Sequence, residues 1–285
     1  MRCNSIAFLI ILLHCNLNSA SKLWGVLWNP EPKRSPKATD RIYGGVEAGR
    51  DEFPFMAAVI LGEAALCGGA LVSSTSVLTS AQCLLTSFEV INVHLGVHNL
   101  TDDTETGRII IKATRTIAHE QFNSLNLDND IGIIKLPMSV EASNILPVAL
   151  PSRSFAEGNS FENYTARIFG WGLRSSAPSA IFPDILHTAE SMVINNTVCE
   201  DIYELFVPYV TPRKLCLDNS GLSGACIGDA GGPIVTTRPE DGKFVLIGTI
   251  SFSAGPCGYE MPVIAARLSL YLDWIGFYAD VAIDD

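Results

Sequence analysis

Basic residues are scarce in this chain. Lysine and arginine total 19 against 30 aspartate and glutamate residues, so the 285-residue chain has a formal net charge of −11 at pH 7. Binding to nucleic acid depends on clusters of Lys and Arg that neutralise phosphates. The deficit therefore argues against a nucleic-acid partner, and we interpret the acidity as a source of solubility.

Long apolar runs are also missing. The apolar stretch at residues 7–13 is far shorter than the roughly 20 residues that a membrane-spanning helix needs. It follows Arg2 and precedes small polar residues that end at Ala20, which is the layout of a secretory signal peptide. We therefore predict a signal peptide over residues 1–20, a secreted extracellular protein and no membrane anchor. An uncleaved anchor is the alternative.

Residues 21–41 differ in composition from the rest of the chain. They contain five basic residues, two acidic residues and three prolines, with little apolar periodicity. This composition predicts an extended or disordered basic propeptide that ends at Arg41.

From residue 42 to residue 285 we predict one all-β domain, because short β-rich runs alternate with turns and no internal repeat is present. The expected strands are Phe55–Ile60, Ala70–Ser73, Glu89–Leu95, Arg108–Ile117, Ile131–Leu136, Ala166–Trp171, His187–Val193 and Phe244–Ser251. Only the C-terminal end has a helical pattern, with one apolar face made of Leu268, Leu272, Ile275 and Ala279.

The cysteines fit a secreted protein. Two of the eight, Cys3 and Cys15, leave with the predicted signal peptide. An even set of six remains, which in an oxidising compartment predicts three disulfides, and 15 pairings are possible. The six are Cys67, Cys83, Cys199, Cys216, Cys226 and Cys257. Three N-glycosylation sequons begin at Asn99, Asn163 and Asn195.

Four motifs occur in an order that carries a family resemblance. They are Arg41-Ile42-Tyr43-Gly44-Gly45, Thr79-Ser80-Ala81-Gln82-Cys83, Asp128-Asn129-Asp130-Ile131 and Gly228-Asp229-Ala230-Gly231-Gly232-Pro233. Each motif alone is a weak signal. Together, and with Gly170-Trp171-Gly172 and Ser251-Phe252, they closely resemble the trypsin/chymotrypsin family of serine proteases over residues 42 to about 280.

The resemblance implies a fold and a disulfide pairing. The fold is two six-stranded antiparallel β-barrels that pack face to face with a cleft between them, followed by a C-terminal α-helix. The implied disulfides are Cys67–Cys83, Cys199–Cys216 and Cys226–Cys257, all of which close short loops. Loops of this length correspond to roughly 3 kcal/mol each in the chain-entropy model.

The same comparison places alanine and glutamine where the family has its reacting groups. A serine hydroxyl attacks the substrate after a histidine takes its proton, and an aspartate orients that histidine. Here Asp130 matches the aspartate, but Gln82 falls at the histidine position and Ala230 at the serine position. We predict a natural pseudoenzyme, with engineering or sequence error as the alternative. We also expect the Gln82 amide and the Ser251 hydroxyl to donate to Asp130.

The parts of an activation switch match the family as well. Cleavage after Arg41 would free the amino group of Ile42, which the resemblance pairs with Asp229. The alternative is that these residues are inherited and never cut. The backbone amides of Gly228 and Ala230 match an oxyanion hole, with a collapsed loop as the alternative.

The sequence evidence for the specificity pocket and for a metal site is weaker. Alignment puts Gly224 at the base of the pocket and Ser253 and Val263 on its walls, so the pocket has no acid and is narrowed by valine. The acidic residues Asp102, Asp103 and Glu105 lie where some relatives bind calcium, but Val97 falls at a ligand position. We therefore predict an acidic solvated turn, no metal and no cofactor.

These observations favour a secreted, non-catalytic serine protease homologue that binds an extracellular protein. The partner would be a protease, a zymogen or an inhibitor, and the protein a regulator or cofactor of an extracellular proteolytic cascade. The alternative is a trypsin-like serine endopeptidase, which similarity over the whole domain alone would suggest.

Overall fold

The computed structural model describes residues 45–62, 65–85, 90–174, 176–177, 179–203, 210–219, 224–254, 257 and 261–285. The chain divides into two units, residues 1–39 and 40–285, and every described residue belongs to the second. The predicted signal peptide, the propeptide, Arg41 and Ile42 lie outside the described residues.

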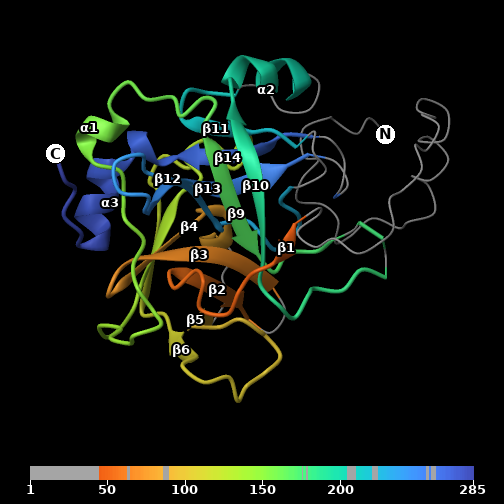
Figure 1. Ribbon diagram of the computed structural model, residues 1–285, viewed down its shortest axis with the longest axis vertical. Coiled ribbons are helices and arrows are strands. Elements are labelled where there is room, and N and C mark those ends of the chain that lie inside the picture. Colours follow the sequence, from red (N-terminus) through yellow and green to blue (C-terminus); the bar gives the residue numbers. More distant parts are fainter. Residues whose placement is uncertain are drawn as a thin grey trace, which may run out of the picture. The chain divides into compact units, whose positions relative to one another are not determined.

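Two antiparallel sheets make up the described fold, and they occupy the lower and upper halves of Figure 1. The first has the order β6-β5-β2-β3-β4-β8-β7. Its segments are β2 (Met56–Leu61), β3 (Ala65–Ser73), β4 (Ser76–Thr79), β5 (Ile91–Leu95), β6 (Ile109–Lys112), β7 (Arg115–Ala118) and β8 (Gly132–Lys135).

The first sheet is a curled half-barrel, and its two edge segments β6 and β7 follow one another in the chain. The single expected strand Arg108–Ile117 bends at Ala113 and Thr114 into the two edge segments β6 and β7. The amide of Ala113 donates to Ile91 O at 2.9 Å, whereas the amide of Thr114 donates to Lys135 O at 3.1 Å. The bend therefore transfers the chain from the β5 edge of the sheet to the β8 edge.

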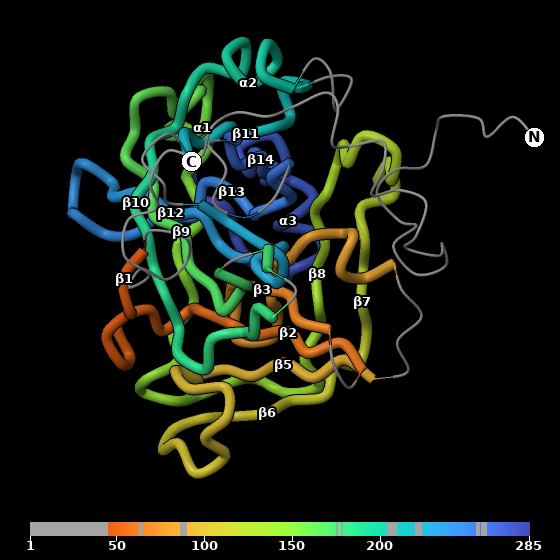
Figure 2. Tube along the Cα trace, turned by 90° about the vertical axis from the view of Figure 1, so that its right-hand side faces the viewer, coloured from red at the N-terminus to blue at the C-terminus, as the bar shows by residue number. Residues whose placement is uncertain are grey.

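The second sheet closes into a six-stranded barrel, as expected. Its order is β10-β11-β14-β13-β12-β9, with β9 paired back to β10 and β1 added to β10 (Figure 2). The strands are β1 (Val46–Glu47), β9 (Thr165–Gly170), β10 (His187–Ile194), β11 (Lys214–Leu217), β12 (Pro233–Thr237), β13 (Phe244–Ser253) and β14 (Val263–Arg267).

Helices are few. The predicted C-terminal helix is α3 (Leu272–Ala279), and its last carbonyl accepts hydrogen bonds from the hydroxyls of Ser73 and Ser76, each at 2.9 Å. The sequence did not predict α1 (Arg153–Ala156) or α2 (Asn196–Tyr203). Among the described residues, no helix has the length and apolarity that crossing a membrane requires.

Side chains of β2 show how one strand serves two cores. Ala57, Val59 and Leu61 point into the interior of the curled first sheet, whereas Met56 and Ala58 join the core that also holds Phe169 and Leu246 of the second barrel. Successive strand residues face opposite sides of a sheet, so a strand buried on both faces needs a continuous apolar run. The run Met56–Leu61 meets that requirement.

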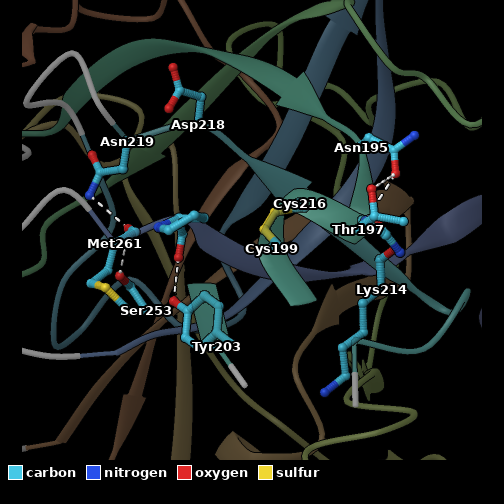
Figure 3. Close-up of a disulfide and its surroundings, with 12 residues drawn as sticks. Asn195, Thr197, Cys199, Tyr203, Lys214, Cys216, Asp218, Asn219, Ser253 and Met261 are labelled. Atoms are coloured by element: carbon cyan, nitrogen blue, oxygen red, sulfur yellow. Dashed lines mark hydrogen bonds between the residues drawn. A yellow bond between two sulfur atoms is a disulfide. The ribbon is translucent and has the colours of Figure 1, made fainter. Parts of the chain in front are cut away.

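Three disulfides join the cysteine pairs that the resemblance implied. The Cα atoms are 6.4 Å apart in Cys67–Cys83, 6.4 Å in Cys199–Cys216 and 5.4 Å in Cys226–Cys257. The second pair ties α2 to β11 (Figure 3). The first pair holds the segment that contains Gln82, and the third holds the loop that leads to Ala230.

Backbone packing between the two sheets leads to a test on Gly68. A Cβ atom at Gly68 of β3 would lie 2.6 Å from the Cα atom of Gly232, which is closer than real Cβ contacts come. We expect Gly68→Ala to lower the free energy of unfolding in urea by about 1–3 kcal/mol, because overpacking forces backbone shifts. Gly276→Ala is the matched control, because its Cβ would lie 3.3 Å from Ile283. Equal stability of the two variants would contradict the packing argument.

Candidate functional site

The carboxylate of Asp130 lies buried between the two sheets, with 1% of its surface exposed. It accepts a hydrogen bond from the Gln82 amide Nε2 at 2.6 Å and one from the Ser251 hydroxyl at 2.5 Å. The backbone N–H of Gln82 donates to its other oxygen at 2.9 Å. The expected contacts from Gln82 and Ser251 are therefore present. Because Gln82 precedes β5 in the first sheet and Ser251 belongs to β13, Asp130 connects the two halves.

Both N–H groups of the Gln82 side chain donate hydrogen bonds across this connection. Besides Asp130, Nε2 donates to the backbone carbonyl of Ser251 at 2.8 Å. The carbonyl oxygen Oε1 of the amide takes no part in these two bonds. A side-chain amide with both N–H groups engaged has a fixed orientation. Gln82 is therefore a rigid part of the wall between the two sheets.

Burial raises the pKa of the Asp130 carboxyl above its ordinary value, although hydrogen bonds from Ser251 and Gln82 and the charge of Lys214 oppose that effect. Lys214 of β11 is itself buried, and its ammonium donates to Asn126 O at 2.5 Å. The ammonium also lies 5.4 Å from the ring centroid of Phe252. Burial lowers the pKa of Lys214. The sequence alone did not reveal this second charge beside Asp130.

A cavity of about 280 Å³ opens beside Gln82 and Ala230. Its other lining residues include Asn219, Ala225, Ile227, Ser251 and Ser253. Among the described residues, none of those that line the cavity has an ionisable side chain, since Cys226 and Cys257 are joined in a disulfide. The cavity therefore suits an uncharged group.

The predicted pocket residues fall in different places. Ser253 lines the cavity, but Gly224 and Val263 are not among its described lining residues. A Cβ at Gly224 would lie 2.5 Å from the side-chain oxygen of Asn219, so the Asn219 amide covers that glycine. Val263, with 1% of its surface exposed, packs into the second barrel's core. Asn219 is thus a lining residue that sequence reasoning missed.

The loop around Ala230 has the backbone geometry of a tight turn. Gly228 and Gly231 have φ angles of +100° and +80°, a region that favours glycine. Within the part of the chain that is described, the amides of Gly228 and Ala230 donate to no protein acceptor. The ring of Phe182 lies against Gly228, because a Cβ there would be 2.7 Å from its Cε1 atom. Gly228 and Ala230 of this loop both line the cavity.

Asp229 is a second buried carboxylate, with 1% of its surface exposed. The backbone amides of Gly172 and Cys226 donate to it at 2.8 and 2.9 Å. A Cβ at Gly172 would lie 2.4 Å from this carboxylate, so only glycine fits there. No cation contacts Asp229 in the described ranges, and burial raises its pKa to about 7. Its predicted partner, Ile42, lies outside those ranges.

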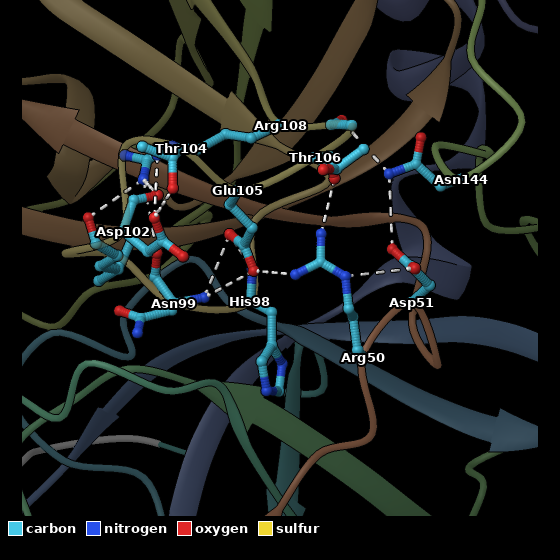
Figure 4. A network of polar contacts seen from close by, with 12 residues as sticks. Arg50, Asp51, His98, Asn99, Asp102, Thr104, Glu105, Thr106, Arg108 and Asn144 are labelled. Carbon is cyan, nitrogen blue, oxygen red and sulfur yellow. Dashed lines mark hydrogen bonds and ion pairs between the residues drawn. The ribbon is translucent and has the colours of Figure 1, made fainter.

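The acidic loop at residues 97–108 is not simply solvated, which corrects the prediction for Glu105. The Glu105 carboxylate is 1% exposed and accepts the backbone N–H of His98 at 2.9 Å and the Arg50 guanidinium at 2.6 Å (Figure 4). Asp102 and Asp103 remain exposed. Arg50 of the same chain thus supplies the positive charge that pairs with Glu105 in this loop. Across the described residues, no group of three or more His, Cys, Asp or Glu side chains could hold a metal ion.

The Gln82 contacts lead to a stability test. We expect Gln82→Leu to lower the free energy of unfolding by about 1–3 kcal/mol, because it removes the side-chain amide donor from a buried carboxylate and leaves only the Ser251 hydroxyl and the backbone N–H of residue 82. The measurement is urea unfolding of the variant beside the wild type. In an Asp130→Asn background the same substitution should cost clearly less, since the buried charge is gone. An equal cost in both backgrounds would show that Gln82 does not act through Asp130.

The buried Asp229 predicts a pH dependence for the uncleaved chain. Its folded pKa of about 7 lies above the ordinary 3.8, so the folded state binds the proton more tightly than the unfolded state. Stability is then fully present at acidic pH and is lost as the pH rises towards and through 7, by on the order of 4 kcal/mol. Urea unfolding from pH 4 to 8 should show this decline in the wild type and a flatter profile in Asp229→Asn. Parallel profiles would contradict it.

Comparison with known proteins identifies the family. The family model described as Trypsin matches residues 42–275. Brachyurin from Leptuca pugilator is 33% identical over 236 residues, which cover 82% of this chain and 96% of brachyurin. Chymotrypsin-C from Mus musculus is 34% identical over 254 residues, which cover 86% of this chain and 91% of that protein.

Solved structures agree with the sequence relatives. The structure of HL collagenase matches with a TM-score of 0.72 and 30% identity, covering 84% of this chain and 98% of that chain. This match supports the all-β fold described above, with few helices and a C-terminal helix. This chain belongs to the trypsin family of serine proteases.

Proposed function

We propose that this member of the trypsin family is a secreted, non-catalytic homologue that acts by binding another extracellular protein. The observation that carries the proposal is that Gln82 and Ala230 line one cavity, at the positions of base and nucleophile in the family motifs. A methyl group cannot attack a carbonyl, and an amide does not take up a proton near neutral pH. Both steps of the family's chemistry therefore lack their reacting atoms.

The size of the loss supports this proposal. Removing one such reacting group costs on the order of a million-fold in turnover. An oxyanion hole without nucleophile and base keeps only about a thousand-fold over water. A residual rate of that size would not sustain a physiological protease.

No other described residue offers a replacement base. His94, His98, His119 and His187 are all described, and none lines the cavity beside Ala230. His94 contacts Arg108, and His119 packs against the ring of Trp274. Their distance from the cavity favours binding over catalysis.

Two features of the cavity support binding of a peptide. The cavity is uncharged, and the amides of Gly228 and Ala230 remain available as donors. These features support capture of an uncharged side chain without cleavage of the chain that carries it. We propose a protease, a zymogen or an inhibitor as the partner, and a role as regulator or cofactor of an extracellular proteolytic cascade.

An activation switch forms part of the proposal. Asp229 is a buried acid with two amide donors and a raised pKa, and a newly freed ammonium would satisfy it. Opposite charges attract strongly in a dry environment. We propose that cleavage between Arg41 and Ile42 inserts the Ile42 amino group beside Asp229 and changes the binding surface.

A capture experiment tests the binding role and the switch together. Uncleaved wild type, trypsin-cleaved wild type and trypsin-cleaved Asp229→Asn are immobilised and exposed to native extracellular fluid. Amino-terminal sequencing should show a new Ile42 terminus in both cleaved samples. We expect a protein that binds the cleaved wild type at least tenfold more than the other two forms.

Two results would contradict the proposed switch and the proposed binding. Absence of an Ile42 terminus after trypsin treatment would remove the switch. Equal retention of every extracellular protein by the three forms would remove cleavage-dependent binding. The family's usual activity, serine endopeptidase, is the competing function, and cleavage of the retained protein by the immobilised wild type would favour it.

A further inference from the structure

The sequon Asn195-Asn196-Thr197 lies where β10 ends and α2 begins. The Asn195 side-chain oxygen accepts hydrogen bonds from both the backbone N–H and the hydroxyl of Thr197, each at 2.9 Å (Figure 3). Its side-chain nitrogen donates to Glu162 at 3.1 Å. Asn195 is exposed, so the nitrogen to which a sugar would attach is accessible in the folded protein.

A groove of about 750 Å³ runs beside this asparagine. Ile194, Val210 and Leu270 give it apolar surface, and Asn159, Glu162 and Glu200 give it polar groups. Leu270 is 55% exposed. The described lining residues of this groove share no member with those of the cavity at Ala230. The groove is therefore a separate surface from the protease-like cleft.

We propose that Asn195 carries an N-linked oligosaccharide whose first sugars lie in this groove. In the transfer, the Asn195 nitrogen forms a bond to the anomeric carbon of an oligosaccharide linked to a lipid pyrophosphate. The lipid pyrophosphate leaves with the electrons of the broken bond, and the nitrogen loses one proton. The modified nitrogen keeps one N–H, which is enough to maintain its hydrogen bond to Glu162.

The chemistry of the groove fits a sugar chain. Sugar rings present apolar C–H faces and many hydroxyls, so they suit a surface where Leu270 and Val210 alternate with amide and carboxylate groups. An N-linked glycan is bulky and solubilising and lies at the protein surface. Covering Leu270 with sugar removes an apolar side chain from water without requiring a protein partner on this face.

The other two sequons do not lie beside this groove. The Asn99 side-chain oxygen accepts the same two hydrogen bonds from Thr101, at 3.0 and 2.8 Å, but Asn99 is half-buried and its backbone N–H donates to Glu105 at 3.2 Å. Asn163 is exposed but has a left-handed φ of +68°, and the Thr165 of its sequon begins β9. Neither asparagine is among the described residues that line the groove. Asn195 is thus the exposed sequon asparagine that adjoins the groove.

Mass spectrometry of the secreted protein tests the attachment. The full chain is produced in a eukaryotic secretory cell and treated with an amidase that removes N-linked glycans in heavy-oxygen water, which labels each formerly glycosylated asparagine. We expect the label at Asn195 in the wild type and in Thr197→Ser, which keeps the sequon, and its loss in Thr197→Ala. An unlabelled Asn195 in the folded, secreted wild type would overturn the proposal.

Hydrogen–deuterium exchange tests the place of the sugars. Secreted Thr197→Ala, which keeps an unmodified Asn195, is compared with glycosylated Thr197→Ser, because removal by the amidase would leave an aspartate at position 195. We expect exchange to rise at residues 156–160 and 268–271, which border the groove, and to stay unchanged at residues 56–61 of β2. Unchanged exchange at the groove, with Asn195 occupied, would show that the glycan points away from it.

Discussion

The buried carboxylate of Asp130 is the constraint on which the cleft depends. A charge at this depth is costly unless donors surround it, and the donors come from both sheets: Gln82 from the first half and Ser251 from the second. Losing an imidazole at this place would leave the carboxylate without its main partner. A glutamine amide replaces the hydrogen bond without replacing the base, and it adds a second bond to Ser251 O. The hydrogen bonds that join the two halves at Asp130 therefore do not require an imidazole at this place.

The rest of the cleft follows from backbone geometry more than from side chains. Gly68 lets β3 approach Gly232, Gly172 leaves room for Asp229, and Gly228 and Gly231 adopt φ angles that favour glycine. None of these requirements involves a serine or a histidine. The cavity and the buried acid therefore do not depend on the two reacting groups, which is consistent with the binding function that we propose.

Much of this site could be predicted from the sequence because its residues lie in contiguous motifs. The Gln82–Asp130 contact and the three disulfides were anticipated in this way, and they are present. The helix α2 was missed because Cys199 and Tyr203 are its only buried residues, which is too few for a periodic pattern. The bend at Ala113 and Thr114 was missed because the run Arg108–Ile117 contains no glycine, proline, asparagine, aspartate or serine to mark a turn. The sequence also could not predict contacts between residues of different motifs. Arg50 pairs with Glu105 across 55 positions, and Asn219 covers Gly224 only once the chain is folded.

The most direct measurement of the central claim is labelling with a fluorophosphonate probe, which reacts with an activated serine. The wild type and a Gln82→His, Ala230→Ser double variant are cleaved after Arg41 and exposed to the probe side by side. We expect no labelling of the wild type at Ala230 or at any other residue of the cavity. We expect stoichiometric labelling of the double variant, because Asp130 and the backbone donors are already in place. Labelling of the wild type at the level of the double variant would contradict the account.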